Sequence, residues 1–109
     1  MDERVKEYLQ DILEQAREIL EFTEGMSCEA YLSDRKTQAA VERKFEIMGE
    51  ALNRIHSADG ELLEKIRDYR NIISFRNILA HGYDSIDNLV VWGVIENDLN
   101  GLIDDATAL

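Results

Sequence analysis

The sequence contains no proline and only six glycines among 109 residues, so few residues in it would interrupt helices. Its single cysteine, Cys28, excludes an internal disulfide and a cysteine-based metal site, and is typical of a reducing compartment. No apolar run approaches the roughly 20 residues that span a bilayer, and the acidic, amphipathic start differs from a signal peptide. We therefore expect one cytoplasmic domain over residues 1–109, with no membrane segment.

Basic side chains are also scarce, with 12 Lys and Arg against 23 Asp and Glu and a formal net charge of −11. Such a charge opposes binding to a phosphate backbone unless the basic residues are concentrated in one place. Residues 65–83 hold four basic side chains and one acidic side chain, Asp68. On charge alone, this segment is either a surface for nucleic acid or a set of solvated helix charges balanced by acids elsewhere.

Apolar residues recur at helical three-and-four spacing along almost the whole sequence, which predicts an all-α fold. The first helix covers residues 5–23, and Gly25 follows its end. The second begins after Ser33 or Asp34, either of which can cap it, and continues to Ile55.

Two further helices complete the pattern after a break at residues 57–60. The third extends from Leu62 to about Gly82, and Asp87 caps the fourth, which continues to Leu102. Short connections between helices favour antiparallel neighbours. We expect an up-and-down bundle of four principal helices, or five if the segment between the first two is helical.

The end of the third predicted helix has an unusual concentration of Arg76, Asn77, His81 and Tyr83. On an ideal helix, residues five apart lie about 140° around and roughly 7.5 Å along the axis, so Arg76 and His81 do not share a face. A long arginine side chain and a fraying last turn before Gly82 would still let them converge.

This pair could cleave a phosphodiester bond of RNA without a metal. Arg76 would bind the phosphate and stabilise developing charge, and His81, with an ordinary pKa of about 6.5, would transfer the proton. Asn77 would orient the phosphate or the histidine, and Tyr83 would stack on a base or hydrogen-bond a phosphate oxygen. The spacing is also compatible with a histidine that only interacts with the helix C-terminal carbonyls.

Several segments resemble one known family. The stretch RNILAHGY fits the R-x4-H-x-Y signature of the HEPN superfamily of small helical ribonucleases, and its surroundings resemble the HepT-type toxin branch. YLQDILEQAREILEF is similar to the first helix of that branch, and DSIDNLVVWGVIENDLNGL to its closing helix. AVERKFEIMGEALNRI is similar to its second long helix, with the Gly49-Glu50-Ala51 element. The resemblance covers nearly the whole chain and implies a HEPN-like bundle.

The resemblance implies a metal-independent endoribonuclease without a cofactor, acting as a homodimer with a composite site between subunits. Arg76 and His81 would be catalytic and Asn77 supportive. Tyr83 matches the tyrosine to which an MNT-type nucleotidyltransferase antitoxin adds AMP, which implies a type VII-like toxin–antitoxin system. The alternative is a non-catalytic HEPN module that binds a nucleotide or a partner. Many relatives have a Pro-Trp element shortly before the motif, which this chain lacks.

Other residues allow two interpretations each. Glu50 either orients Arg76 or is a helix-surface acid. Arg67 and Arg70 either extend an RNA surface or bind phosphates of the transferred nucleotide. His56 is expected near the end of the second helix, where it either caps the helix, the more economical account, or has a catalytic role. Trp92 is expected in the core or in a dimer interface.

Overall fold

The computed structural model describes residues 2–67, 69–81 and 87–109, and for residues 78–81 it describes the backbone only. These residues contain helices and no strand, which confirms the all-α class. The helices, in chain order, are α1 (Glu3–Phe22), α2 (Cys28–Leu32), α3 (Arg35–Leu63), α4 (Tyr69–His81), α5 (Asn88–Asn97) and α6 (Leu99–Thr107).

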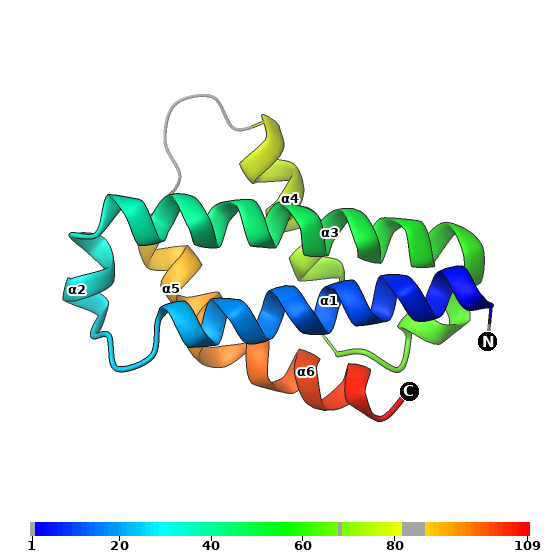
Figure 1. Ribbon diagram of the computed structural model, residues 1–109. Helices are drawn as coiled ribbons and strands as arrows, with labels where there is room; N and C mark the ends of the chain where they lie inside the picture. The colour runs from blue at the N-terminus through cyan, green and yellow to red at the C-terminus, as the bar shows by residue number, and fades with distance from the viewer. Residues whose placement is uncertain (1, 68, 82–86) are drawn as a thin grey trace.

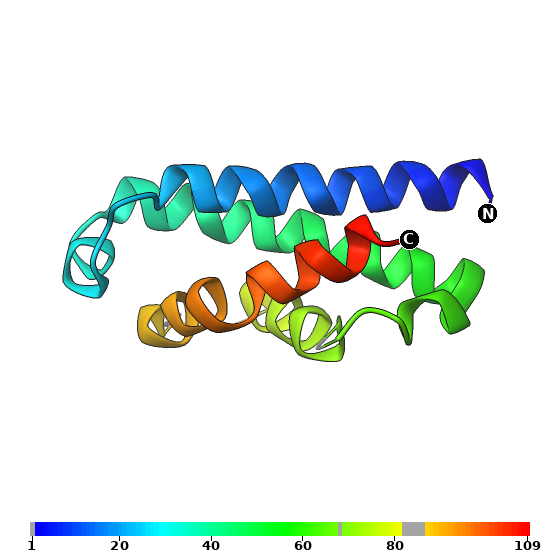
Figure 2. The same ribbon diagram turned by 90° about the horizontal axis from the view of Figure 1, so that it is seen from below.

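The two long helices, α1 and α3, lie side by side and antiparallel, with α2 at one end of the pair and α4, α5 and α6 on one side of it (Figures 1 and 2). As predicted, α1 buries one stripe of apolar side chains at three-and-four spacing: Val5, Leu9, Ile12, Ala16 and Ile19. The predicted N-caps are confirmed as well. Asp34 accepts a hydrogen bond from the Thr37 amide at 3.0 Å, and Asp87 accepts one from the Leu89 amide at 3.0 Å.

The predicted break at residues 57–60 is confirmed as a kink within α3, which ends at Leu63. Asp59 alone has a non-helical backbone there, with φ −157° and ψ 77°. Its carboxylate accepts a hydrogen bond from the Leu62 amide at 3.3 Å, so it provides an acceptor for the next helical turn. The predicted start of the third helix at Leu62 is wrong, because α3 ends at Leu63 and α4 begins only at Tyr69.

The predicted fourth helix is two helices that meet at Asp98, whose amide still donates to the Val94 carbonyl at 3.0 Å. The turn keeps Ile95 of α5 and Leu99 of α6 buried, at 3% and 0% exposure. Two short segments of different direction therefore place their apolar faces on the same core, where one straight helix was expected (Figure 1).

Aromatic contacts connect α5 to α2 and α4 to α3. Trp92 of α5 is buried, and its ring lies 5.4 Å from that of Tyr31, in the short helix α2. Phe45 of α3 and Phe75 of α4 meet edge to face at 5.0 Å. Of the two predicted environments for Trp92, the structure shows the core. Among the described residues, no helix has the length and apolar character needed to cross a membrane.

Candidate active site

The candidate site lies where α4 crosses α3, and a glycine sets the distance between the two helices. A Cβ atom placed on Gly49 would overlap the Cβ and Cγ atoms of Arg76. Only glycine therefore lets the start of the Arg76 side chain lie directly on the backbone of α3. The Phe45–Phe75 contact packs the same two helices together.

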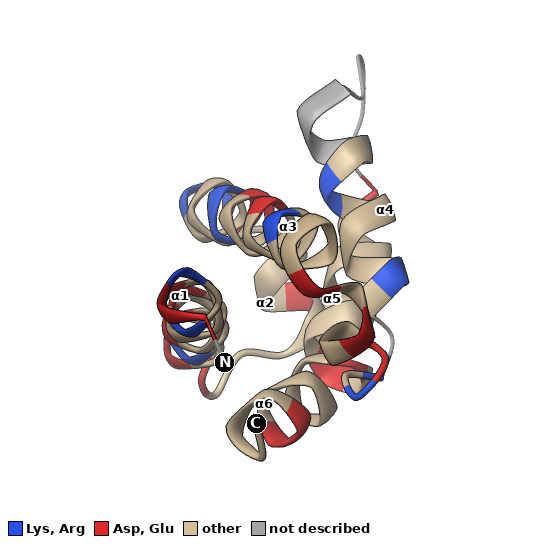
Figure 3. Ribbon diagram, turned by 90° about the vertical axis from the view of Figure 1, so that its right-hand side faces the viewer, with Lys and Arg blue, Asp and Glu red and all other residues tan. Residues whose placement is uncertain are grey.

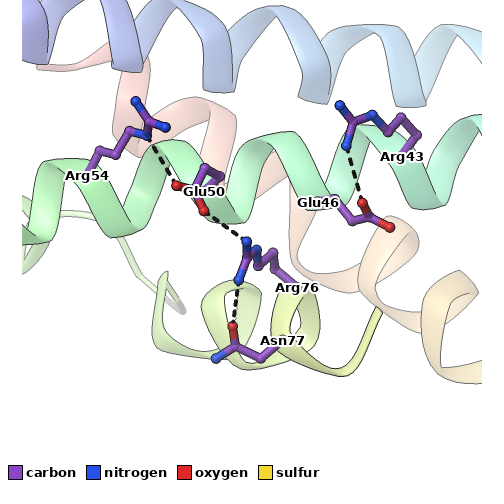
Figure 4. Close-up of polar contacts among 6 residues, drawn as sticks. All are labelled: Arg43, Glu46, Glu50, Arg54, Arg76 and Asn77. Atoms are coloured by element: carbon purple, nitrogen blue, oxygen red, sulfur yellow. Dashed lines mark hydrogen bonds and ion pairs between the residues drawn. The ribbon is translucent and has the colours of Figure 1, made fainter. Parts of the chain in front are cut away.

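Arg76 is held by two neighbours, one from each helix (Figure 4). Its Nη2 donates to Oε2 of Glu50 at 2.9 Å, and its Nη1 donates to Oδ1 of Asn77 at 3.1 Å. The side chain is 24% exposed. Glu50 is thus a partner of Arg76 across the helix crossing and, at 42% exposure, also lies on the helix surface, and its role in orienting Arg76 stays a prediction.

Glu50 is shared between two arginines. Its second oxygen, Oε1, accepts from Nε of Arg54 at 3.2 Å, one turn further along α3. One carboxylate therefore lies between two guanidinium groups, and a positive charge remains on the group of three. Among the described residues, the buried Nε of Arg76 has no hydrogen-bond partner.

Arg76 also lines a hollow of about 280 Å³ on the α1–α3 side of the crossing. Tyr8 of α1 and Arg54 of α3 are part of its wall. Sequence reasoning missed both residues. The i,i+4 spacing from Glu50 could have pointed to Arg54, but nothing in the sequence places Tyr8 beside a motif on another helix.

The other motif residues are placed only in part. His81 is the last residue of α4, and the structure describes only its backbone. Tyr83 lies outside the described residues. The convergence of Arg76 with His81 and the role of Tyr83 therefore stay predictions.

Arg67 and Arg70 lie in the positively charged segment, and both form ion pairs with acids of this chain. Arg67 donates from its amide and Nε to Oδ2 of Asp105, at 2.9 and 2.8 Å, and from Nη2 to Oδ1 at 3.0 Å. Nη2 of Arg70 donates to Oε1 of Glu64 at 2.8 Å. Figure 3 shows both signs of charge on α1 and α3. The local excess of basic residues counted along the sequence is thus largely balanced in space.

The carboxyl groups in these two pairs have lowered pKa values. Hydrogen bonds from the Arg67 side chain hold the pKa of the Asp105 carboxyl below its usual range. Hydrogen bonds from Tyr69 and then from Arg70 do the same for the pKa of Glu64. Both carboxylates are therefore stabilised in the charged form by the fold.

His56 lies near a helix end, as the sequence suggested. It is exposed and precedes by three residues the non-helical residue Asp59, where α3 is kinked. Among the described residues, no group of three or more His, Cys, Asp or Glu could hold a metal ion. The groups brought together at the crossing are instead arginines, an amide and a carboxylate.

Comparison with protein-family models matches residues 12–109, nearly the whole chain, to the family described as Ribonuclease HepT-like. The chain belongs to this family. Membership in the HepT-like family confirms both the resemblance and the predicted class of enzyme, a ribonuclease.

Curated HepT-like relatives match over most of their length. A protein of Thermococcus cleftensis named as a probable ribonuclease HepT is 38% identical over 97 residues, which are 89% of this chain and 87% of the relative. A candidate RNase of Methanocaldococcus jannaschii is 33% identical over 95 residues, 87% of this chain and 86% of the relative. No solved structure matches this HepT-like chain at a significant level.

Proposed function

We propose that this chain is a metal-independent endoribonuclease in which Arg76 binds the scissile phosphate and His81 transfers the proton. The observation that supports this most is the fixed position of Arg76, held by Glu50 and Asn77 at the edge of an open hollow. A prepositioned guanidinium stabilises charge that develops on phosphate oxygens, because it needs no reorganisation during the reaction.

The group formed by Arg76, Glu50 and Arg54 favours phosphate binding at Arg76. Glu50 alone would neutralise Arg76, but Glu50 also pairs with Arg54, so the three side chains retain one net positive charge. Glu50 therefore orients the guanidinium without cancelling its charge. Glu50 and Asn77 act as positioning residues, and Arg76 contacts the substrate.

The reaction needs no further protein nucleophile, because the 2′-hydroxyl of RNA attacks the neighbouring phosphorus. The bond from phosphorus to the 5′-oxygen then breaks, and His81 gives a proton to that leaving oxygen. His81 ends α4, and a helix C-terminus favours the protonated imidazole that this step requires. Its side chain would have to reach the phosphate held by Arg76.

The proposed active form is a homodimer with a composite site. One histidine cannot accept the 2′-hydroxyl proton and donate to the leaving oxygen in the same step, whereas a two-fold arrangement supplies a second Arg76 and a second His81. The proposed setting is the cytoplasm.

The proposed regulator is an MNT-type nucleotidyltransferase antitoxin that transfers AMP to Tyr83, in a type VII-like toxin–antitoxin pair. Tyr83 follows His81 by two residues in the sequence, so an added nucleotide would lie close to the proposed pair. Its bulk and negative charge would obstruct RNA and repel its phosphates.

Cleavage of a fluorophore-quencher RNA in the presence of a chelator tests the catalytic proposal. Arg76→Ala and His81→Ala should each lower the rate by about 100-fold or more, as loss of one transition-state donor does. Arg17→Ala, an exposed arginine of α1, is the matched control and should cleave as wild type. Wild-type rates in Arg76→Ala would refute the proposal, as would a wild-type protein that leaves RNA intact.

The antitoxin proposal is tested by the intact mass of the protein co-expressed with a neighbouring nucleotidyltransferase gene. Increments of adenylate should appear in the wild type and be absent from Tyr83→Phe. Equal increments in both proteins would place the modification elsewhere, and no increment in either would contradict regulation by AMP transfer.

A further inference from the structure

Two hollows adjoin each other between α1 and α3, next to the proposed site. The hollow beside Arg76 measures about 280 Å³, and the second, towards the N-terminus of α1, measures about 470 Å³. Both are lined by Tyr8, Glu50 and Arg54, so these three side chains form the junction of one continuous groove. The groove begins where Arg76 would hold a phosphate.

The hollow beside Arg76 has balanced charge. Three basic and three acidic side chains line it: Arg43, Arg54, Arg76, Asp11, Glu46 and Glu50. Two of the acids are already paired, with Arg43–Glu46 at 3.3 Å and Arg76–Glu50 at 2.9 Å. A channel for a nucleic-acid backbone has an excess of positive charge. The balance here suits a neutral group with hydrogen-bond donors instead.

Flat side chains form the junction of the groove. The Tyr8 ring is half-buried on α1, and the Arg54 guanidinium lies 5.9 Å from its centroid. Aromatic rings and guanidinium planes are the surfaces on which unpaired bases stack. Glu50 connects this junction to Arg76 through a single carboxylate, so the stacking surface and the phosphate-binding side chain are held in fixed relation.

We propose that the hollow is a nucleobase subsite for the nucleotide next to the scissile phosphate. The base stacks on Tyr8, and its exocyclic amino group donates to the carboxylates of Asp11 and Glu46. Because cytosine has an amino group where uracil has a carbonyl oxygen, the subsite favours cytosine over uracil. This inference rests on the proposed function, since Arg76 has to hold the adjoining phosphate.

Binding of fluorescein-labelled hexanucleotides with 2′-O-methyl ribose tests the subsite directly. These probes lack the 2′-hydroxyl nucleophile, so fluorescence anisotropy measures affinity without cleavage. Hexacytidylate should bind more tightly than hexauridylate. Tyr8→Leu should weaken binding of hexacytidylate at least about five-fold, the low end of the effect of losing one stacked base. Tyr8→Phe should stay within about two-fold of the wild type, because the ring remains.

The matched control is Phe22→Leu. Phe22 is also an aromatic residue of α1 with a cation over its ring, Lys44 at 5.1 Å, but it lies at the other end of the helix. It should bind both probes as the wild type does. Asp11→Asn combined with Glu46→Gln should reduce the preference for cytosine while Tyr8 still stacks the base.

Several results would overturn the inference. These are wild-type affinity in Tyr8→Leu, equal binding of the two probes by the wild type, or no binding of either probe. Thermal unfolding of Tyr8→Leu and Tyr8→Phe shows whether a lost affinity reflects a lost fold. RNA cleavage measured in parallel separates the two proposals. Arg76-dependent cleavage without a Tyr8 effect refutes only the subsite, and Tyr8-dependent binding without cleavage refutes only the catalytic proposal.

Discussion

Two arginines of this protein lie against a glycine of a neighbouring helix and pair with a carboxylate of that same helix. Arg76 lies on Gly49 and pairs with Glu50 of α3. Arg67 lies on Gly101, where a Cβ would be 3.1 Å from its Cδ, and pairs with Asp105 of α6. The same arrangement, an arginine on a glycine with a carboxylate from the same helix as its partner, occurs at two places.

The two pairs differ in how fully the partners satisfy each other. Asp105 accepts three hydrogen bonds from Arg67, with both of its oxygens, and so attaches the α3–α4 connection to α6. Glu50 gives Arg76 one oxygen and Arg54 the other. We infer that the Arg67 pair is structural, and that the Arg76 pair positions a charge for a substrate.

Exposure alone would suggest the opposite assignment. The Arg67 side chain is 64% exposed, whereas that of Arg76 is 24% exposed. An exposed arginine in a positively charged segment suggests a phosphate contact, yet this one is held by an acid 38 residues away in the sequence. The hydrogen-bond partners of an arginine therefore indicate its role better than its exposed fraction does.

The largest expected effect comes from filling the tighter of the two glycine contacts. Gly49→Ala should lower the free energy of unfolding by about 1–3 kcal/mol, because the added methyl group overlaps the start of the Arg76 side chain and the helices have to separate. Gly101→Ala should lower the free energy of unfolding much less, since the Arg67 side chain can shift by a few tenths of an ångström.

Urea denaturation of both variants measures this difference, with Gly93→Ala as the control. A Cβ on Gly93 meets only the side-chain amide of Asn97, at 3.9 Å, so the better helix propensity of alanine should stabilise that variant by up to about 1 kcal/mol. Equal stability of Gly49→Ala and Gly93→Ala would show that the α3–α4 crossing is not as close as described.

Glu50→Gln should have an intermediate effect that appears in catalysis. The amide can still accept a hydrogen bond, but it holds the guanidinium of Arg76 less firmly than a carboxylate does. We expect the RNA cleavage rate to fall about ten-fold, because small misplacements of a catalytic group are costly. The stability should change by less than about 0.5 kcal/mol.

Glu61→Gln, an exposed acid near the end of α3, is the matched control for that measurement and should cleave as wild type. If Glu50→Gln also cleaves at the wild-type rate, Glu50 does not position Arg76 for the reaction.

The smallest expected effect is a pH-dependent loss of stability in Asp105→Asn. The pKa of Asp105 is lowered in the folded protein, so its charged form stabilises the fold above the ordinary carboxyl range, and this contribution disappears as pH falls through the folded pKa. Asp105→Asn should therefore have a lower Tm than the wild type at neutral pH. The difference should shrink below about pH 4.

Asp104→Asn, the exposed neighbour on α6, should show no such pH-dependent deficit. A Tm difference for Asp105→Asn that stays constant from neutral pH to pH 3 would contradict the role of its charge.

Features that depend on neighbours in the sequence could be predicted. The apolar stripe of α1 and the N-caps Asp34 and Asp87 follow from local spacing and side-chain chemistry, and the structure confirms them. The break at Asp59 was predicted too, but the start of the next long helix was wrong, because one more turn follows Asp59 before α4 begins at Tyr69. Where a long helix resumes after such a break depends on packing against other elements.

Features that depend on distant pairs could not be derived from the residues. The resemblance identified Arg76 and the Gly49-Glu50-Ala51 element as family features, but no sequence spacing shows that Glu50 contacts Arg76 across 26 residues. The same limit applies to Asp105, whose pairing with Arg67 changes the interpretation of the positively charged segment. A charge count over one segment of the sequence leaves out the acids that folding brings next to that segment.

The central claim is that Arg76 is the functional arginine and Arg67 the structural one. Its most direct test measures RNA cleavage and thermal unfolding on the same preparations of Arg76→Lys and Arg67→Lys, because lysine keeps the charge but loses the planar fork of donors. We expect Arg76→Lys to cleave about 100-fold more slowly with a nearly unchanged Tm, and Arg67→Lys to have a lower Tm and a nearly wild-type rate where both are folded. An equal loss of cleavage in the two variants, or a loss confined to Arg67→Lys, would contradict the account.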